Sequence, residues 1–312
     1  MRPTRGTALG TMAALAVTPF VVRPARADTA LRVATTPIEL GAQVFYAKEL
    51  GLYKKAGLDV DVSVMASGGA IAPAVVSGSI DIAQGNVVSI ATAHEKGLPF
   101  VVVGPTALYS SAHPTTALLV AKSSPMRTGK DLNGKTVAVN GLKNITEIGA
   151  SAWIDKSGGD AKTARFVETP FPQMEPGLVA GRLDAAVVAE PDYSLALAHG
   201  LHELAACYDA IAKEFLIGAW FATSTWAKAH PEELKRFVAA TIEAGKWANA
   251  HRAESAKILE KYTKIQVTTG MRRAVYADRL EAAQMQPLID AAAKYGALKA
   301  PFRAADLVAP AA

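Results

Sequence analysis

The chain has 312 residues, half of them hydrophobic, which is enough for one large domain or two moderate ones with sizeable cores. Its 33 basic and 28 acidic residues give a formal net charge of +5, but four arginines and no acidic residue precede Asp28. The remaining chain is close to neutral, so its charge offers no argument for nucleic-acid binding. The single cysteine, Cys207, excludes an intramolecular disulfide and a cysteine-based metal cluster.

The first 27 residues have the layout of a secretory signal peptide. Two arginines precede an apolar stretch over about residues 8–22, and Ala25-Arg26-Ala27 is a small-x-small cleavage pattern. A retained membrane anchor is the alternative, but the apolar stretch is short for a span of about 20 residues and Pro19 interrupts it. We therefore expect cleavage after Ala27 and export to the periplasm, if the organism has an outer membrane.

From residue 31 onward, short apolar runs alternate with amphipathic stretches. Strands are predicted over residues 31–37, 58–67, 79–86 and 98–105. Helices are predicted between them, over residues 41–57, 67–78 and 87–97. This alternation predicts an α/β fold with a largely parallel sheet.

A second set of alternating elements follows the first. Its predicted strands cover residues 115–122, 136–140, 164–171 and 183–191. Helices are predicted over residues 145–159 and 173–182, and again over 231–263 and 277–294 near the end of the chain. We therefore expect two lobes of like design. The first lobe is discontinuous, residues 28–120 plus 222–312, and the second, residues 121–221, is inserted in it, with two crossings acting as a hinge.

One phrase occurs once in each predicted lobe. It reads GSIDIAQGN at residues 78–86 and GRLDAAVVAEP at residues 181–191. Its glycine stands where a helix needs a left-handed residue before it turns into a parallel strand. Its aspartate, Asp81 or Asp184, is expected to accept hydrogen bonds from backbone groups at the strand entrance, because a lone buried carboxylate is costly.

The carboxyl ends of these two strands carry polar residues. They are Gly85-Asn86 in one lobe and Glu190-Pro191 in the other. Ligands of open α/β sheets bind outside the carboxyl ends of the strands, so both loops are predicted to face one crevice. Ordinary strand-to-helix connections with good turn chemistry are the alternative.

Five segments occur in an order that is typical of one family: YAKELGLYKKAGLDVDV, SGSIDIAQGN, DLNGKTVAVN, LVAGRLDAAVVAEP and HPEELKRFVAATIEAGKWANAH. Together they resemble the periplasmic solute-binding proteins of the nitrate/sulfonate/taurine type, a group that also includes binders of thiamine pyrimidine precursors. The resemblance covers essentially the whole chain after the leader. It implies a type II periplasmic binding protein fold, with two α/β lobes, a two-strand hinge and a ligand held in the cleft. It also implies a monomer without cofactor that delivers a small solute to an ABC permease in the inner membrane.

The resemblance further implies ligand contacts from the loops that follow the strands. The candidates in the first lobe are Thr36, Ile38, Gln43, Ser67, Gly68, Gly69, Gly85 and Asn86. Those in the second lobe are Asn140, Asn144, Thr146 and Glu190, with Tyr193 and Trp220 as candidate apolar walls.

Each candidate has a structural alternative. The turn at residues 67–69 opens a helix, whose free N–H groups favour an anion but also occur at any helix start. The family usually has a serine-containing turn where this chain has residues 140–146, although Asn144 and Thr146 can still cap the next helix. An ionised Glu190 would repel an anion, which favours a hydrogen-bonding role in the loop or hinge. Tyr193 and Trp220 are residue types found more often in cores.

An enzyme is the main rival to a binding protein. One branch that resembles this family makes a thiamine pyrimidine precursor and carries a cysteine-rich run, whereas this chain has one cysteine. The sequence shows no Walker-type phosphate loop, HExxH or GxSxG motif, so no catalytic or metal-binding residue is proposed. A ligand-sensing module that uses the same cleft is the third alternative. Few basic residues are well placed, Lys143 being the best, which favours an organic anion such as a sulfonate, a taurine-like solute or a carboxylate over nitrate.

Overall fold

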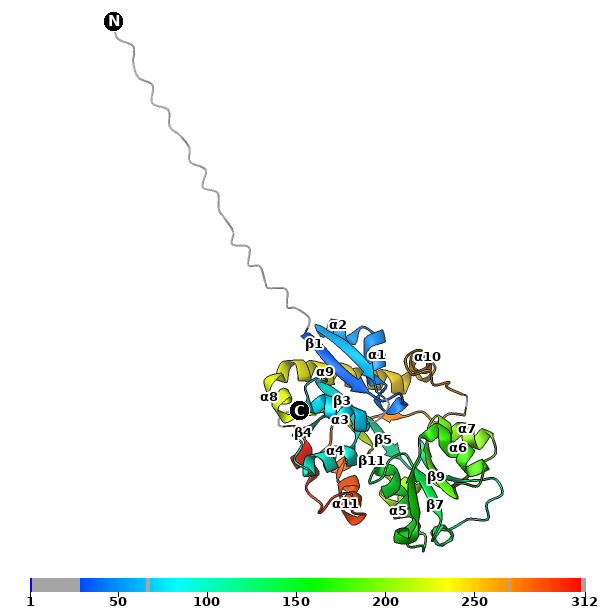
Figure 1. Cartoon of the computed structure of the whole chain (residues 1–312). Coiled ribbons are helices and arrows are strands. Elements are labelled where there is room, and N and C mark those ends of the chain that lie inside the picture. Colours follow the sequence, from blue (N-terminus) through cyan, green and yellow to red (C-terminus); the bar gives the residue numbers. More distant parts are fainter. Residues whose placement is uncertain (2–28, 66–67, 269, 310–312) are drawn as a thin grey trace.

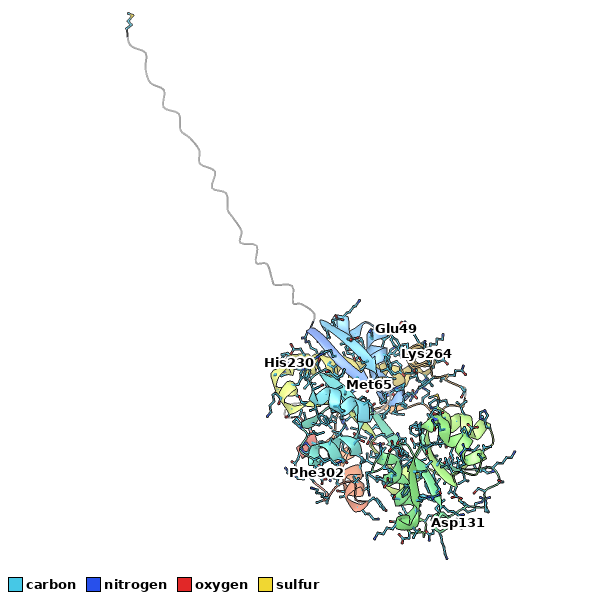
Figure 2. All side chains as sticks on the ribbon, viewed as in Figure 1. Glu49, Met65, Asp131, His230, Lys264 and Phe302 are labelled. Carbon is cyan, nitrogen blue, oxygen red and sulfur yellow. The ribbon has the colours of Figure 1, made fainter. Side chains whose placement is uncertain are left out.

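The computed structural model describes Met1 and residues 29–65, 68–268 and 270–309 (Figure 1). The predicted leader, its cleavage site after Ala27 and the candidate Ser67 lie outside the described residues. Within those residues, no helix combines the length and the apolar character that a membrane span requires. The two lobes predicted from the sequence are evident, and Asp131 lies at the end of the second lobe that is remote from the first (Figure 2).

The first lobe contains a five-stranded sheet. Its strands, in spatial order, are β2 (Leu58–Val64), β1 (Thr29–Thr35), β3 (Ile82–Asn86), β12 (Gly218–Thr223) and β4 (Phe100–Pro105). β1 pairs in parallel with β2 and β3, whereas β12 is antiparallel to β3 and β4. The single antiparallel strand is the one that returns from the second lobe, so the sheet is largely parallel, as predicted.

Helices flank this sheet. They are α1 (Gln43–Glu49), α2 (Leu52–Lys55), α3 (Gly68–Val76), α4 (Val87–Glu95), α8 (Ser224–Ala229), α9 (Pro231–Ala250) and α10 (Arg252–Thr263). The single helix predicted over residues 41–57 is wrong, because Gly51 adopts a left-handed conformation (φ 69°) that separates α1 from α2. Buried residues of α1 and α9 belong to the same hydrophobic core, which closes this face of the sheet.

The second lobe contains another five-stranded sheet. Its strands, in spatial order, are β10 (His202–Ala205), β6 (Thr116–Val120), β9 (Ala185–Ala189), β7 (Thr136–Val139) and β8 (Arg165–Glu168). β7 is parallel to β8 and β9, whereas β6 is antiparallel to β9 and β10. Its helices are α5 (Ile145–Lys156), α6 (Phe171–Val179) and α7 (Asp192–Ala198).

The repeated phrase behaves as predicted in both lobes. Gly78 and Gly181 adopt left-handed conformations, with φ of 73° and 67°. Asp81 accepts a hydrogen bond from the backbone N–H of Arg32 in β1 (2.9 Å), and Asp184 accepts one from that of Thr136 in β7 (2.8 Å). Each carboxylate therefore ties the entrance of one central strand to its parallel neighbour.

A third, three-stranded sheet links the lobes. It contains β11 (Glu214–Leu216), β5 (Ala107–Ser110) and β13 (Val275–Tyr276) in that order. In β5 and β11 the chain passes between the two lobes, as the two predicted crossings require, whereas β13 was not predicted. β6 belongs to the second-lobe sheet and β12 to the first, so both crossings fall a few residues before the predicted boundaries. A strand pattern in the sequence does not say which sheet the strand joins.

The C-terminal helix lies between the lobes. A helix was predicted over residues 277–294, but α11 (Gln286–Lys294) forms only at its C-terminal end, after a short 3-10 turn. α11 packs against α4 of the first lobe and α5 of the second. Just after α11, the Tyr295 hydroxyl donates a hydrogen bond to the Asp155 carboxylate of α5 (3.1 Å), which ties the helix to the second lobe.

Candidate functional site

Several first-lobe candidates lie where parallel strands end. Thr36 and Ile38 follow β1, Gly68 and Gly69 begin α3 after β2, and Asn86 ends β3. The Thr36 hydroxyl donates a hydrogen bond to the Gln84 side-chain oxygen of β3 (3.0 Å). The structure therefore brings the loop after β1 and the end of β3 together, as expected for neighbouring parallel strands.

Asn86 is the N-cap of α4. Its side-chain oxygen accepts a hydrogen bond from the backbone N–H of Ser89 (2.9 Å), and its side-chain nitrogen donates to the Ser89 hydroxyl (3.0 Å). The cap satisfies one of the N–H groups that a helix start leaves free. The positive end of the α4 dipole thus stands at the carboxyl end of β3.

The loop after β7 is braced by two of its own candidates. The Thr146 hydroxyl donates a hydrogen bond to the Asn140 side-chain oxygen (2.8 Å) and accepts one from the Asn140 backbone N–H (3.3 Å). Asn144 occupies the N-cap position of α5 but makes no capping bond, so the prediction that it caps the helix is wrong. Its side-chain oxygen is instead buried without a hydrogen-bond partner among the described residues, which is an unfavourable state that a bound donor would relieve.

Lys143 lies in the same loop but is already engaged. The backbone of Lys143 adopts a left-handed conformation (φ 55°), and its N–H donates a hydrogen bond to the Glu147 carboxylate (2.8 Å). The ammonium lies 3.9 Å from that carboxylate and 3.4 Å from the Tyr295 carbonyl oxygen after α11. The positive charge is therefore partly compensated in place.

Glu190 is buried, and its carboxylate accepts three hydrogen bonds from neighbouring groups. One carboxylate oxygen accepts hydrogen bonds from the Ser194 hydroxyl (2.7 Å) and the Arg272 backbone N–H (3.0 Å), and the other accepts the Ser194 N–H (3.2 Å). Burial raises the pKa of Glu190, although these hydrogen bonds oppose the shift. The hydrogen-bonding role that the sequence allowed is thus the one the geometry supports.

The remaining candidates with large side chains lie in hydrophobic cores. Trp220 is 1% exposed, packs edge-on against Phe237, and donates its ring N–H to the Gln43 side-chain oxygen (3.1 Å). Gln43 is also fully buried, and its side-chain nitrogen has no partner among the described residues. Tyr193 is fully buried and donates its hydroxyl to the Glu203 carboxylate. In this structure both rings fill cores, and their role as pocket walls stays a prediction.

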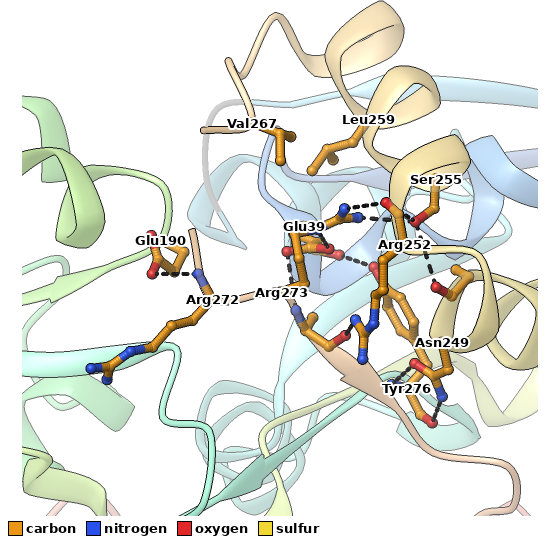
Figure 3. Close-up of polar contacts among 12 residues, drawn as sticks. Glu39, Glu190, Asn249, Arg252, Ser255, Leu259, Val267, Arg272, Arg273 and Tyr276 are labelled. Atoms are coloured by element: carbon orange, nitrogen blue, oxygen red, sulfur yellow. Dashed lines mark hydrogen bonds and ion pairs between the residues drawn. The ribbon is translucent and has the colours of Figure 1, made fainter. Parts of the chain in front are cut away.

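One cluster of charged residues near these loops was not predicted from the sequence. Glu39, which begins a 3-10 turn four residues after the end of β1, accepts hydrogen bonds from the Arg273 guanidinium (2.5 Å) and the Ala274 backbone N–H (3.1 Å), as Figure 3 shows. The neighbouring residue, Arg272, is the one whose N–H bonds Glu190. The partners are 234 and 82 residues apart in sequence, so no local pattern marked them.

Two α/β lobes joined by short linking strands define the periplasmic binding protein class of fold. More particularly, the chain belongs to the NMT1/THI5 like family, whose family model matches residues 41–255. No curated protein matches the chain significantly.

Solved structures resemble the chain at low sequence identity. The periplasmic aliphatic sulphonate binding protein SsuA from Escherichia coli has a TM-score of 0.74 and 18% identity, over 90% of this chain and 92% of that one. The periplasmic nitrate-binding protein NrtA from Synechocystis has a TM-score of 0.73 and 17% identity, over 91% and 86%. A DSZB mutant in complex with biphenyl-2-sulfinic acid has a TM-score of 0.66 and 15% identity, over 90% and 96%. At these identities the likeness establishes the fold.

Proposed function

We propose that this protein is the extracytoplasmic substrate-binding component of an ABC importer, and that it binds a small organic anion between its lobes. The observation that carries the proposal is a pair of helix starts. α4 begins at Asn86 in the first lobe and α5 at Asn144 in the second, each after the carboxyl end of a parallel strand. The two helices contact one another and share one hydrophobic core, which supports the proposal that their N-termini face the same interlobe region.

The ligand would be recognised mainly by amides and helix N–H groups. Helix starts favour the negative charge of the solute, whereas the unpartnered Asn144 side-chain oxygen would accept a hydrogen bond from a donor elsewhere on the organic body. Among the described residues, Lys143 in the loop before α5 and Arg272 beside Glu190 each already lie beside a carboxylate, Glu147 and Glu203 respectively. A site with so little free positive charge suits a sulfonate or carboxylate on an organic body better than nitrate.

The mechanism would be mechanical rather than chemical. A solute that touches loops of both lobes gains its full set of contacts only when those loops are at the right separation, so binding shifts the population toward one interlobe arrangement. A permease in the inner membrane would recognise that arrangement. A monomer in the periplasm, exported by the predicted leader, is part of this proposal.

An enzyme remains the second candidate because DSZB, which resembles the chain in fold, binds a sulfinic acid in its solved complex. The one cysteine of this chain does not favour that alternative. Cys207 is fully buried, and burial raises the pKa of its thiol to about 12. The nucleophilic thiolate is therefore scarce at neutral pH, and the thiol is shielded from a solute.

The decisive experiment combines binding and turnover on one preparation of purified protein. Isothermal titration calorimetry with butane-1-sulfonate, taurine and nitrate would measure affinity, and chromatography of the same mixtures would detect conversion. Native mass spectrometry of gently isolated protein would identify any solute that copurifies. We expect saturable binding of an organic anion that is recovered unchanged. Conversion of a bound compound would establish an enzyme, and the absence of both binding and a copurified solute would contradict the proposal.

A further inference from the structure

Residues 270–274, which we call the strap, touch both lobes. They follow α10 of the first lobe and lead into β13 of the linking sheet. Figure 3 shows the strap running between Glu190 on one side and Glu39 on the other, with the Arg272 and Arg273 side chains pointing in different directions. Neither the strap nor Glu39 has a role in the proposed binding of a solute.

The first half of the strap is attached to the second lobe. The Arg272 backbone N–H donates to Glu190, and the Ser194 hydroxyl, which donates its proton to Glu190, also lies 3.3 Å from the Gly270 carbonyl oxygen. The Arg272 guanidinium lies 4.9 Å from the centre of the Tyr193 ring and 3.6 Å from the Glu203 carboxylate. It also donates to the carbonyl oxygen of Pro114, two residues before β6 (3.2 Å).

The second half of the strap is attached to the first lobe. The Arg273 guanidinium donates to the Glu39 carboxylate and to the Arg252 carbonyl at the start of α10 (2.9 Å). Its side chain is 10% exposed and that of Glu39 is 5% exposed, so this ion pair is shielded from water. The Ala274 N–H completes the attachment by donating to the other Glu39 oxygen.

The two carboxylates therefore bind strap residues 272 and 274, which are separated by one residue. Two extended residues span at most about 7 Å, so the strap limits how far the two attachment points can move apart. Glu39 follows β1 and stands directly beside the loop of Thr36 and Ile38, and Glu190 follows β9. A short covalent segment thus connects the strand-end loops of the two lobes.

We propose that Glu39 and Glu190 are positioning residues that, through the strap, hold the strand-end loops of the two lobes at the separation that binds solute. This inference rests on the proposed function, since it takes those loops to be the solute-binding loops. The strap then favours the interlobe arrangement that binds solute, so a smaller part of the solute's binding energy is needed to shift the population toward that arrangement.

Interlobe distances measured without any solute test the strap directly. Spin labels on Lys54→Cys in the first lobe and Lys162→Cys in the second occupy exposed positions, while the native Cys207 is buried. Pulsed electron paramagnetic resonance should give a narrow distance distribution for the otherwise unaltered protein. Glu190→Ala should broaden it, because the strap loses its acceptor in the second lobe. Glu175→Ala, a matched change at a second-lobe carboxylate that contacts His199 instead, should leave it narrow.

Calorimetry with butane-1-sulfonate gives the second measurement. Glu190→Ala should weaken binding about tenfold. The control Glu175→Ala should keep both the affinity and the urea midpoint of the unaltered protein. Arg272→Ala serves if Glu190→Ala does not fold, because it keeps the main chain but removes the guanidinium contacts to the second lobe. Unchanged distance distributions in both strap variants would overturn the inference. A broadened distribution in a protein that binds none of the tested solutes and copurifies with none would uphold the strap and refute the proposed function.

Discussion

Substitutions at Asn86 can distinguish its role as the N-cap of α4, which affects stability, from its proposed contact with an anion, which affects binding. Its side-chain oxygen caps the helix through the Ser89 N–H, and Asn86 is also a candidate ligand residue. Asn86→Ala removes both roles, and loss of an N-cap costs about 1 kcal/mol of stability. Asn86→Asp keeps an oxygen acceptor for the same N–H and adds a negative charge at the positive end of the helix dipole. Its stability should therefore equal or slightly exceed that of the unaltered protein.

The effect on binding should be opposite for an anionic solute. Two like charges about 4 Å apart repel by roughly 4 kcal/mol at an effective dielectric constant of about 20, and water in the site reduces this value. Even about a third of that repulsion weakens binding roughly tenfold. Asn86→Asp should thus be a stable protein that binds butane-1-sulfonate at least about tenfold more weakly.

Urea unfolding and calorimetry on the same samples check this pair of outcomes. Gln266→Glu is the matched control, since it makes the same amide-to-carboxyl change on an exposed side chain of the first lobe. If Asn86→Asp binds the sulfonate as tightly as the control does, the anionic group does not lie near the start of α4. That result would refute the interpretation that the start of α4 recognises the anionic group, on which the choice of an anion depends.

Three further changes test the remaining reasoning. Because burial raises the pKa of Glu190, its proton stabilises the fold below about pH 4.5, and this contribution is lost as the pH rises through the raised value. The free energy of unfolding relative to Glu190→Gln should therefore fall in urea titrations as the pH rises above about 4.5, and an opposite slope would contradict it. Arg273→Met leaves the Glu39 carboxylate buried without its partner and should cost about 3–5 kcal/mol, while the double change with Glu39→Gln should cost less than the sum. Gly149→Ala would place a methyl group 2.4 Å from a Tyr208 ring carbon and should destabilise by about 1–3 kcal/mol in the same assay, despite the better helix propensity of alanine.

The strand and helix order could be predicted from the sequence because each strand–helix unit buries its own apolar run. The repeated phrase predicted both left-handed glycines and both aspartate contacts at the strand entrances, since all of these are local chemistry. The linking sheet was harder to predict. β11, β13 and β5 have two to four residues each, which is too few for an alternating pattern to stand out.

The candidate site divides in the same way. Asn86 and its capping role follow from a residue type at the end of a predicted strand and the start of a predicted helix. The Glu39–Arg273 pair joins residues 234 apart and depends on how the C-terminal segment returns past β1, which no periodicity encodes. Tyr193 and Trp220 show the limit of assigning side chains from residue type, because a large aromatic residue fits a core or a pocket equally well in sequence.

The central strands β3 and β9 carry the same aspartate contact where they begin but different residues where they end, and under the proposed function this difference suits the two lobes to binding a solute. At each entrance an aspartate ties the central strand to its neighbour, which fixes the sheet. At the carboxyl end of β3, Asn86 turns the chain into α4 and caps it, so the positive end of the helix dipole lies there. At the exit of β9, Glu190 receives the strap instead. A carboxylate there would repel an anion, but bonded to the strap it places its own loop relative to the other lobe. The first exit is thus suited to contact a solute and the second to set the distance across which the solute must reach.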